Sequence, residues 1–322
     1  MELSLVIPVY NEVESLPHLY TKLVQQLEAL GKTWEIIFVD DGSKDGSTEV
    51  LKRLQSEDSR ITVAIQRRNF GKSLALAVGF ELARGDVIIT MDADLQDEPS
   101  EIPNLLAKID EGYDLVVGWK KKRHDPLSKT IPSYIANRIT RLLTGVQLHD
   151  MNSGLKAMQA EVARTIRIYG DLHRYIPIIA HYNGFAVTEI PVVHHQRQFG
   201  RSKYGPGRLL RGGFDLLTVV FVANYRYRPL HLFGGIGSLM TFLGLVINAY
   251  LTIEWFRGDR PIGDRPLLTL GVLLMIVGVQ LLTIGLLAEL LVSSIQQRAN
   301  PLDTVRQVLS VSSAQKEFNR ES

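Results

Sequence analysis

The 322-residue sequence contains no cysteine. It therefore forms no disulfide bond, and it has neither a thiolate metal site nor a cysteine nucleophile. The sequence also has no large excess of charge of one sign, because its 22% charged residues leave a formal net charge of +2. This balance excludes a strongly basic nucleic-acid-binding protein. No signature of a DNA- or RNA-binding module is present, so we expect no nucleic-acid partner.

The beginning of the chain lacks the features of a secretory signal. An apolar segment, Leu3–Val9, follows the first two residues without a basic region or a small-residue cleavage site. We therefore expect the N-terminal domain to remain in the cytoplasm.

Short apolar segments alternate with helical patterns from residue 3 to residue 118. The segment Leu3–Val9 is almost continuously apolar, as is typical of a parallel strand covered on both faces. Leucines then recur at helical spacing from Leu16 to Leu30, and Gly31 ends that helix. Further strands are expected at 35–39, at 62–66, from 87 onward and at 114–118. Five strands alternating with helices predict an α/β domain with a right-handed, mostly parallel sheet and flanking helices.

Acidic side chains follow three of these strands. They are Glu12, the pair Asp40-Asp41, and the carboxylates of the series Asp92-Ala93-Asp94-Leu95-Gln96. The carboxyl ends of parallel strands meet at one edge of the sheet, where α/β proteins bind ligands. Carboxylates that converge there repel one another unless a cation or a ligand's donors are present. Helix-capping aspartates explain one such cluster but not three, so this edge is predicted to hold Mg²⁺ or Mn²⁺ together with a diphosphate.

A basic loop precedes the third helix. Its sequence Asn69-Phe70-Gly71-Lys72-Ser73 resembles the end of a phosphate-binding P-loop, but the first glycine of that motif would fall at Gln66. Two interpretations therefore remain, a basic loop that contacts phosphate or base and an ordinary turn.

The last third of the chain is the most apolar. Residues 232–253 and 267–288 are each free of charge and long enough to span roughly 30 Å of hydrocarbon as helices. An amphipathic helix at 206–230, with basic positions such as Arg208 and Arg211 on one stripe, is expected to lie in the membrane interface. The predicted organisation is a cytoplasmic catalytic domain (1–205), this interfacial helix (206–230), two transmembrane helices (231–295) and a cytoplasmic tail (296–322).

Polar and small residues within the two spans predict how they pack. Asn248 and Gln280 are expected to form interhelical hydrogen bonds. Six glycines are expected to allow close helix packing: Gly234, Gly235, Gly237, Gly271, Gly278 and Gly285. The glycine-rich hairpin also suggests a homo-oligomer. In the first domain, His194 and His195 are expected on a strand, on opposite faces, with a packing or surface role.

The acidic motifs together resemble a known family. Pro8-Val9-Tyr10-Asn11-Glu12, Asp40-Asp41-Gly42-Ser43 and Asp92-Ala93-Asp94 are similar to the signature positions of family 2 glycosyltransferases, which have the GT-A fold. The longer set is similar to the polyprenyl-phosphate glycosyltransferases, which include dolichyl-phosphate mannose synthases and bactoprenol glucosyltransferases. The motifs that carry this closer likeness are Arg68–Lys72, Asp94–Pro99, Asp150 with Ser153-Gly154, and Arg201–Tyr204.

The resemblance implies roles for individual residues. Those implied to bind the nucleotide end of a donor are Pro8, Tyr10, Glu12, Asp41, Lys72 and Asp92. Asp94 and Gln96 are implied as metal ligands, with Asp92 within reach of the cation. Those implied to act on the reacting phosphates are Asp94, Asp150, Lys120, Arg201 and Lys203. Lys120 stands where the family often has arginine, so it keeps the positive charge but cannot form the bidentate hydrogen bonds of a guanidinium. For Asp150, the alternative interpretation is a helix-capping or loop residue.

The implied activity is the metal-dependent, inverting transfer of a hexosyl group to a polyprenyl phosphate at the cytoplasmic face of the plasma membrane. UDP-glucose and undecaprenyl phosphate are the expected substrates, and GDP-mannose is the alternative donor. A processive polysaccharide synthase is a rival, but it needs more membrane helices and a Gln-x-x-Arg-Trp motif that the sequence lacks. A catalytically inactive sugar-nucleotide sensor or flippase-recruiting scaffold is a rival of another class, which the intact Asp92, Asp94 and Gln96 set disfavours.

Overall fold

The computed structural model describes residues 1–121, 138, 140–142, 144–196, 229–258, 266–295 and 305–309. By its contacts the chain divides into two units, Met1–Val219 with Asn300–Ser322, and Val220–Ala299. The predicted interfacial helix lies almost wholly outside the described residues, as do Arg201 and Lys203.

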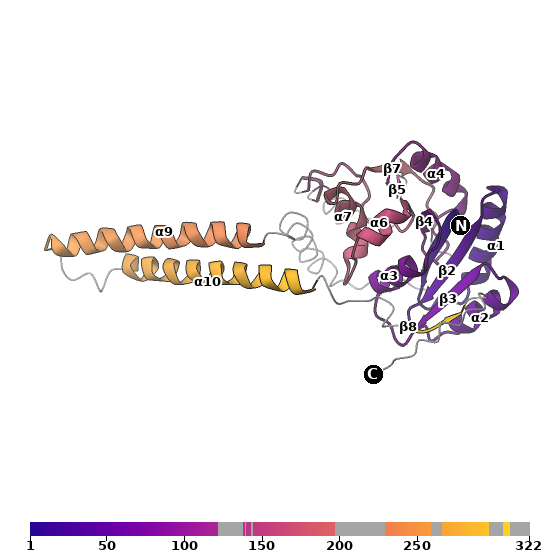
Figure 1. The fold of residues 1–322 in the computed structure, drawn as a ribbon, viewed down its shortest axis with the longest axis horizontal. Coiled ribbons are helices and arrows are strands. Elements are labelled where there is room, and N and C mark those ends of the chain that lie inside the picture. The colour runs from indigo at the N-terminus through magenta and orange to yellow at the C-terminus, as the bar shows by residue number, and fades with distance from the viewer. Residues whose placement is uncertain are drawn as a thin grey trace. The chain divides into compact units, whose positions relative to one another are not determined.

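The first unit is built on an eight-stranded sheet with the strand order β7-β5-β6-β4-β1-β2-β3-β8 (Figure 1). The strands are β1 (Leu3–Val9), β2 (Trp34–Asp40), β3 (Ile61–Gln66), β4 (Val87–Thr90), β5 (Leu115–Trp119), β6 (Lys156–Gln159), β7 (Val187–Pro191) and β8 (Val305–Leu309). The predicted α/β class and mostly parallel central sheet are confirmed.

Strands β4, β1, β2 and β3 form the parallel centre of the sheet. Val9 is in register with Asp40, and Val6 is in register with Thr90. The carboxyl ends of these strands therefore lie along one edge, as predicted. The residues that follow the strands, which include Glu12, Asp41 and Asp92, start from that edge.

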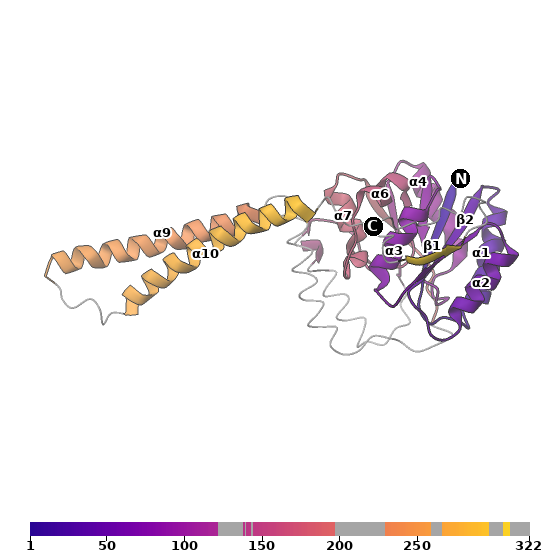
Figure 2. The ribbon, with the colours of Figure 1, turned by 60° about the horizontal axis from the view of Figure 1, so that its bottom comes forward.

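Helices cover both faces of the whole sheet (Figure 2). They are α1 (Leu16–Ala29), α2 (Ser47–Glu57), α3 (Lys72–Leu82), α4 (Ile102–Asp110), α6 (Ala160–Thr165) and α7 (Ile176–Tyr182), with short 3₁₀ turns η1 (Pro99–Glu101) and η2 (Leu172–Tyr175). Leu5 of β1 is buried in one cluster with Leu19 of α1. The neighbouring Val6 points the other way, and Gly79 of α3 approaches it so closely that a Cβ there would lie 2.1 Å from Val6 Cγ1.

The sheet departs from the predicted strand sequence at β6. This strand is antiparallel and lies between β4 and β5, with Ile88 opposite Met158 and Leu115 also opposite Met158. The carboxyl end of β4 is therefore paired with the start of β6, where Thr90 is opposite Lys156. This pairing places the segment before β6 next to the end of β4, which no pattern in the sequence indicated.

One further expectation was wrong, and one strand was not expected. His194 and His195 do not lie on a strand, because β7 ends at Pro191 and His194 forms an isolated antiparallel bridge with Asp97. Strand β8 was not predicted, and it pairs antiparallel with β3 through residues such as Val308, opposite Ala64.

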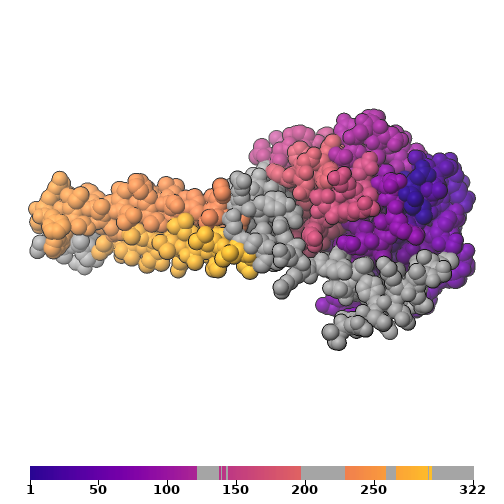
Figure 3. All heavy atoms as spheres, viewed as in Figure 1, coloured from indigo at the N-terminus to yellow at the C-terminus, as the bar shows by residue number. Residues whose placement is uncertain are grey.

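The second unit is a pair of long helices, α9 (Pro229–Phe256) and α10 (Pro266–Ile295), which pack side by side (Figure 3). Both are long and apolar enough to cross a membrane by length and composition. The mean hydropathy of the most apolar 18-residue stretch is 1.9 within Pro229–Phe256 and 2.5 within Pro266–Ala288.

Glycines bring the two backbones close together. A Cβ on Gly237 would lie 2.6 Å from the carbonyl oxygen of Gly278, and a Cβ on Gly244 would lie 2.6 Å from that of Gly271. The packing role predicted for Gly237, Gly271 and Gly278 is confirmed, and Gly244 joins them. By contrast, a Cβ on Gly235 would meet no atom within 4 Å.

The two polar residues of the spans behave differently. Asn248 Nδ2 donates to the carbonyl of Gly244 in its own helix at 3.0 Å and lies 3.4 Å from the Met275 sulfur of α10. Gln280 is exposed on α10, so the expected interhelical position was wrong for this residue.

Candidate active site

The loop after β4 holds the central acidic motif in a tight turn. Asp94 Oδ1 accepts the backbone N–H of Gln96 at 3.3 Å. The residue between them, Leu95, is buried and has φ of +61°, a left-handed conformation that is strained for a bulky side chain. Such strain persists only where the surroundings fix the backbone.

Gln96 is oriented by a segment far along the chain. Its side-chain Nε2 donates to the carbonyl oxygen of His195 at 3.2 Å, and its own carbonyl accepts the N–H of His195 at 2.8 Å. Because a carbonyl oxygen only accepts, the nitrogen of the carboxamide faces His195 and the oxygen Oε1 faces away from it.

Asp92 lies beside a cation from α3. Its carboxylate forms an ion pair with Lys72, the first residue of α3. Gly71, at φ of +97°, turns the chain into this helix. Asp92 is also packed against Gly154, where a Cβ would lie 2.6 Å from the Asp92 carboxyl carbon. Position 154 therefore has no room for a side chain.

Lys120 lies among the carboxylates of the site. Its Nζ is 3.6 Å from Asp97 Oδ1, and its side chain is 15% exposed. Burial, the largest influence, acts to lower the pKa of Lys120, but nearby carboxylates outweigh it and raise the pKa. These carboxylates are, in order of influence, Asp97, Asp150, Asp92 and Asp94. The structure thus gathers Lys120 and three of the predicted acidic residues around one position.

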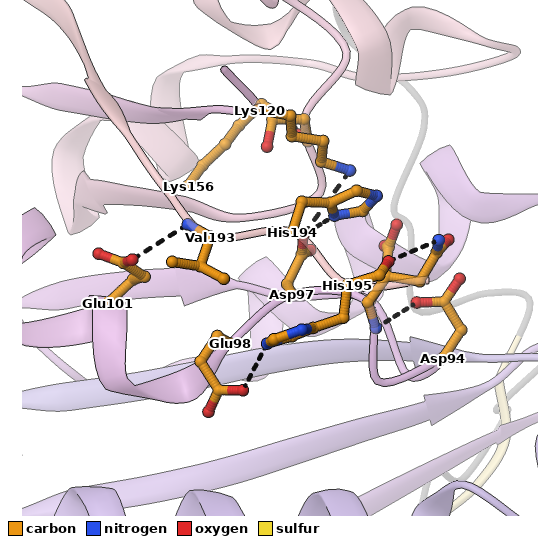
Figure 4. A network of polar contacts seen from close by, with 12 residues as sticks. Asp94, Asp97, Glu98, Glu101, Lys120, Lys156, Val193, His194 and His195 are labelled. Atoms are coloured by element: carbon orange, nitrogen blue, oxygen red, sulfur yellow. Dashed lines mark hydrogen bonds and ion pairs between the residues drawn. The ribbon is translucent and has the colours of Figure 1, made fainter. Parts of the chain in front are cut away.

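Asp97 is a buried carboxylate that the sequence reading did not place in the site. Besides Lys120, it contacts His194, whose Nδ1 is 3.3 Å from Asp97 Oδ1 (Figure 4). Burial alone would raise the pKa of Asp97. The charge of Lys120 and the hydrogen bond from His194 override this and hold the pKa well below the usual range, so the buried group is ionised.

Asp150 is buried in the segment that precedes β6. Glu189 of β7 holds this segment, because its Oε2 accepts the backbone N–H groups of His149 at 2.7 Å and of Asp150 at 3.4 Å. The His149 ring stacks on Trp119, the last residue of β5, with ring centroids 4.3 Å apart. Asp150 therefore lies where β5, β6 and β7 come together.

A second buried lysine lies at the start of β6. Lys156 donates to the backbone carbonyl of Ser153, and the residue is 4% exposed. Burial, followed by repulsion from Lys72, lowers the pKa of Lys156 to about 7, although Asp92 and Asp150 act in the opposite direction. The sequence motif covered Asp150 to Gly154 and gave no role to Lys156.

Four of the six residues predicted to bind the nucleotide, namely Pro8, Tyr10, Glu12 and Asp41, lie at or near the ends of β1 and β2. Tyr10 lines a cleft of about 710 Å³, together with Gly42, Lys44, Arg68 and other residues of the neighbouring loops. Asp41 is buried and accepts the backbone N–H groups of Phe70 at 2.7 Å and Gly71 at 3.0 Å. Burial raises the pKa of Asp41, and the two amide bonds oppose that rise.

The other two residues of this group, Pro8 and Glu12, are held by contacts with neighbouring elements. Pro8 lies in β1 opposite Val39. Glu12 follows β1, where its backbone N–H donates to Ser47 Oγ at 2.8 Å and its carboxylate accepts from Ser15 Oγ at 3.2 Å. Gln66, which also lines the cleft, is 2% exposed, and neither polar atom of its side chain has a hydrogen-bond partner among the residues that the structure describes.

The residues of the 92–96 loop fit a divalent cation. Across the described residues, no three His, Cys, Asp or Glu side chains group as a complete metal site. The loop instead offers the carboxylates of Asp92 and Asp94 and the outward-facing amide oxygen of Gln96. Hard oxygen ligands of this kind suit Mg²⁺ or Mn²⁺, with the remaining positions left to water or a phosphate.

Comparison with known proteins identifies the family. The model of glycosyl transferase family 2 matches residues 4–167. The chain is 37% identical over 314 residues to the dodecaprenyl-phosphate galacturonate synthase of Rhizobium johnstonii, covering 96% of this chain and 93% of that protein. The chain belongs to glycosyltransferase family 2. It is also 37% identical over 311 residues to the undecaprenyl-phosphate 4-deoxy-4-formamido-L-arabinose transferase of Salmonella paratyphi B, with 96% and 94% covered.

These two relatives place the glycosyltransferase in the polyprenyl-phosphate branch that its motifs resemble, which confirms that resemblance. Among solved structures, the fold matches glucosyl-3-phosphoglycerate synthase from Mycobacterium tuberculosis in complex with Mn²⁺, UDP-glucose and phosphoglyceric acid. The TM-score is 0.54 at 17% identity, covering 69% of this chain and 79% of that one. This likeness shows the GT-A fold, as expected.

Proposed function

We propose that this glycosyltransferase moves one glycosyl group from a nucleotide sugar to a polyprenyl phosphate. The observation that carries the proposal is the convergence of Asp92, Asp94, Asp150 and Lys120 at one edge of the sheet, in a chain that matches two polyprenyl-phosphate enzymes over 96% of its length. The loop after β4 and the start of α3 supply the oxygen ligands and the lysine that a diphosphate requires.

Divalent cations fit the 92–96 loop, where we propose Asp94 and Gln96 as ligands, with Asp92 within reach. A bound Mg²⁺ or Mn²⁺ would stabilise the negative charge that develops on the departing diphosphate. Lys72 and Lys120 contribute positive charge at the same place. The acceptor needs little activation, because a phosphate monoester with a second pKa of about 6 is largely ionised near neutral pH.

This acceptor chemistry explains the predicted mechanism. An ionised lipid phosphate attacks the anomeric carbon directly, so the configuration inverts and no dedicated general base is required. We propose that Asp150 orients cationic groups near the acceptor. Arg201 and Lys203, which lie outside the described residues, are proposed to bind phosphate.

The glycosyl group is proposed to be a uronic acid or a modified pentose. Both relatives act, by their names, on sugars other than glucose, namely galacturonate and 4-deoxy-4-formamido-L-arabinose. We therefore rank UDP-galacturonate and the UDP-linked formamido sugar above UDP-glucose, and all of these above GDP-mannose.

We further propose that α9 and α10 anchor the enzyme in the plasma membrane, with the catalytic domain (1–205) and the tail (296–322) on the cytoplasmic side. The proposal is supported by the length and apolar composition of the two helices. Association of hairpins into a homo-oligomer is part of this proposal, and crosslinking in membranes that yields monomer alone would contradict it.

The test is a transfer assay with the full chain in detergent micelles, undecaprenyl phosphate and a panel of radiolabelled donors. We expect product from a UDP-linked sugar, and a loss of rate of about 100-fold or more in EDTA, because cation stabilisation is worth several kcal/mol and each 1.4 kcal/mol is a factor of ten. Mn²⁺ should restore the rate. Product that forms equally well in EDTA would contradict the metal role.

The variant Asp94→Ala separates an enzyme from a scaffold when its transfer activity and its cellular function are both measured. Asp94→Ala should abolish transfer and the cellular function together. A variant that lacks transfer but retains the cellular function would favour the scaffold.

A further inference from the structure

The segment 193–195 runs along residues 96–101, which continue from the 92–96 loop, and each of its three residues contacts them (Figure 4). The backbone N–H of Val193 donates to Glu101 Oε1 at 3.0 Å. His194 contacts Asp97, and the His195 ring lies 3.1 Å from Glu98 Oε2. Together with the two bonds between His195 and Gln96, these contacts clamp the segment to residues 96–101.

His194 is the buried member of this clamp. Its side chain is 5% exposed, whereas the side chain of His195 is 43% exposed. The His194 ring contacts Asp97, the residue directly after Gln96, and the bridge between His194 and Asp97 fixes the two backbones in register. The bridge is made by backbone groups, and the His194 ring adds a side-chain contact to Asp97, the residue directly after Gln96, whereas the His195 ring contacts Glu98.

The position of Gln96 depends on this register. Its Nε2 bonds to the carbonyl of His195, so a shift of segment 193–195 moves the acceptor that orients the carboxamide. Leu95 has a strained left-handed backbone conformation. The 92–96 loop can therefore adopt a less strained conformation if the contacts with segment 193–195 are lost. Lys120 lies beside the same carboxylate oxygen of Asp97 and contributes positive charge there, but the structure shows no contact between Lys120 and the described backbone of residues 193–195.

We propose that His194 is a positioning residue for the divalent cation. Through Asp97 and the 193–195 clamp, it holds the amide oxygen of Gln96 toward the cation that Asp94 also binds. The inference rests on the proposed metal role of Gln96.

The experiment measures UDP binding to the full chain in detergent micelles by calorimetry, with Mn²⁺ and with EDTA. In the wild type, Mn²⁺ should tighten UDP binding. His194→Ala should weaken the Mn²⁺-dependent affinity by about tenfold or more, since loss of an outer partner of a metal ligand costs about 10- to 100-fold. UDP affinity in EDTA should not change. His194→Asn, whose amide can still donate to Asp97, should retain more of the Mn²⁺ effect than His194→Ala.

Two further variants distinguish the proposed effect on cation binding from a general structural defect. In a Gln96→Ala background, His194→Ala should cause no additional loss of Mn²⁺ dependence, because the effect passes through Gln96. Asp97→Asn should reproduce the loss seen with His194→Ala. His18→Ala, an exposed histidine on α1, is the matched control and should bind as the wild type does.

The outcomes are distinguishable. If wild-type UDP binding is indifferent to Mn²⁺, the proposed metal role fails and this inference fails with it. If the wild type depends on Mn²⁺ and His194→Ala keeps that dependence, this inference alone is overturned. Equal loss of UDP affinity with Mn²⁺ and with EDTA would also overturn it.

Discussion

At the scale of single residues, the site is defined by close approach as much as by charge. Asp92 is held between Lys72 and the backbone at Gly154. The carbonyl of Gly154 also accepts a hydrogen bond from Thr90 Oγ1 at 2.8 Å, which fixes the distance between the two loops. A glycine is required here because a Cβ would collide with the Asp92 carboxylate, and not because of the backbone conformation, since the φ of Gly154 is not in the left-handed region.

Gly154→Ala tests this contact. The added methyl group would lie 2.6 Å from the Asp92 carboxyl carbon, so the carboxylate must move. We expect transfer activity to fall about tenfold or more, as is typical when a reacting group is displaced by about an ångström. The thermal midpoint should fall less than it does for a core cavity variant. Wild-type kcat/KM in Gly154→Ala would contradict the assignment.

A buried histidine, His173, bonds to Ser73, the residue after Lys72. His173 is 7% exposed, and its Nδ1 lies 2.8 Å from Ser73 Oγ, which also accepts the His173 backbone N–H at 3.1 Å. Burial is the main cause that lowers the pKa of His173 to about 2, and repulsion from Lys72, Arg174 and Lys156 adds to it. The folded protein thus keeps this ring neutral.

This shift predicts a pH dependence of stability. The pKa of histidine in the unfolded chain is about 6.5, so below that pH the unfolded state binds a proton that the folded state does not. The free energy of unfolding should therefore fall as the pH falls from 6.5, and His173 should contribute a limiting slope of about 1.4 kcal/mol per pH unit. Above pH 7.5 the contribution of His173 should be constant. Thermal midpoints from pH 5 to 7.5 should show a shallower slope for His173→Gln than for the wild type. Parallel slopes would count against the prediction.

At the scale of elements, two features depend on backbone proximity. Strand β6 carries the Asp150 segment to β4, and Glu189 of β7 secures it. In the second unit, α9 and α10 approach so closely at Gly237 and Gly244 that a Cβ at either position would overlap the partner backbone.

The helix pair offers a matched comparison. Gly237→Leu should destabilise the packing of α9 on α10 by about 1–3 kcal/mol, the usual cost of overpacking. Gly235→Leu, two residues earlier on the same helix, points into open space and should be close to neutral. Unfolding of the full chain in an SDS titration measures both. Equal midpoints for the two variants would show that the close contact is absent.

At the scale of the whole molecule, the proposed membrane arrangement predicts which residues face the cytoplasm. Because the chain has no cysteine, single cysteines can be introduced without a background of native thiols. Exposed positions on either unit serve this purpose, such as Glu57 at the end of α2 and Arg257 after α9.

Labelling with a membrane-impermeant maleimide tests the arrangement. Glu57→Cys should react in inside-out vesicles, and Arg257→Cys should react in right-side-out cells, because one crossing separates them. Detergent should make both reactive, which controls for burial of the thiol. Reaction of both on the same side would exclude two spans with the proposed orientation.

The sequence by itself determined the family, the fold class, the central strands and the two apolar helices. These follow from local signals: continuous apolar strands, leucines at helical spacing, and acidic residues directly after strands. It also grouped Asp92, Asp94 and Gln96, because residues two apart in a short loop are close whatever the rest of the chain does.

Only the tertiary structure decided which distant segments meet. The antiparallel insertion of β6 next to β4, the bridge from His194 to Asp97, and the edge strand β8 are pairings between segments far apart in the chain, which no local pattern encodes. Lys156 and Asp97 are ordinary charged residues in the sequence, and only the fold buries both. Burial lowers the pKa of Lys156, whereas Lys120 and His194 hold the pKa of Asp97 low against the effect of burial. Gln280 was misplaced for the same reason, because an apolar helix with weak amphipathic character does not reveal which face it turns to its neighbour.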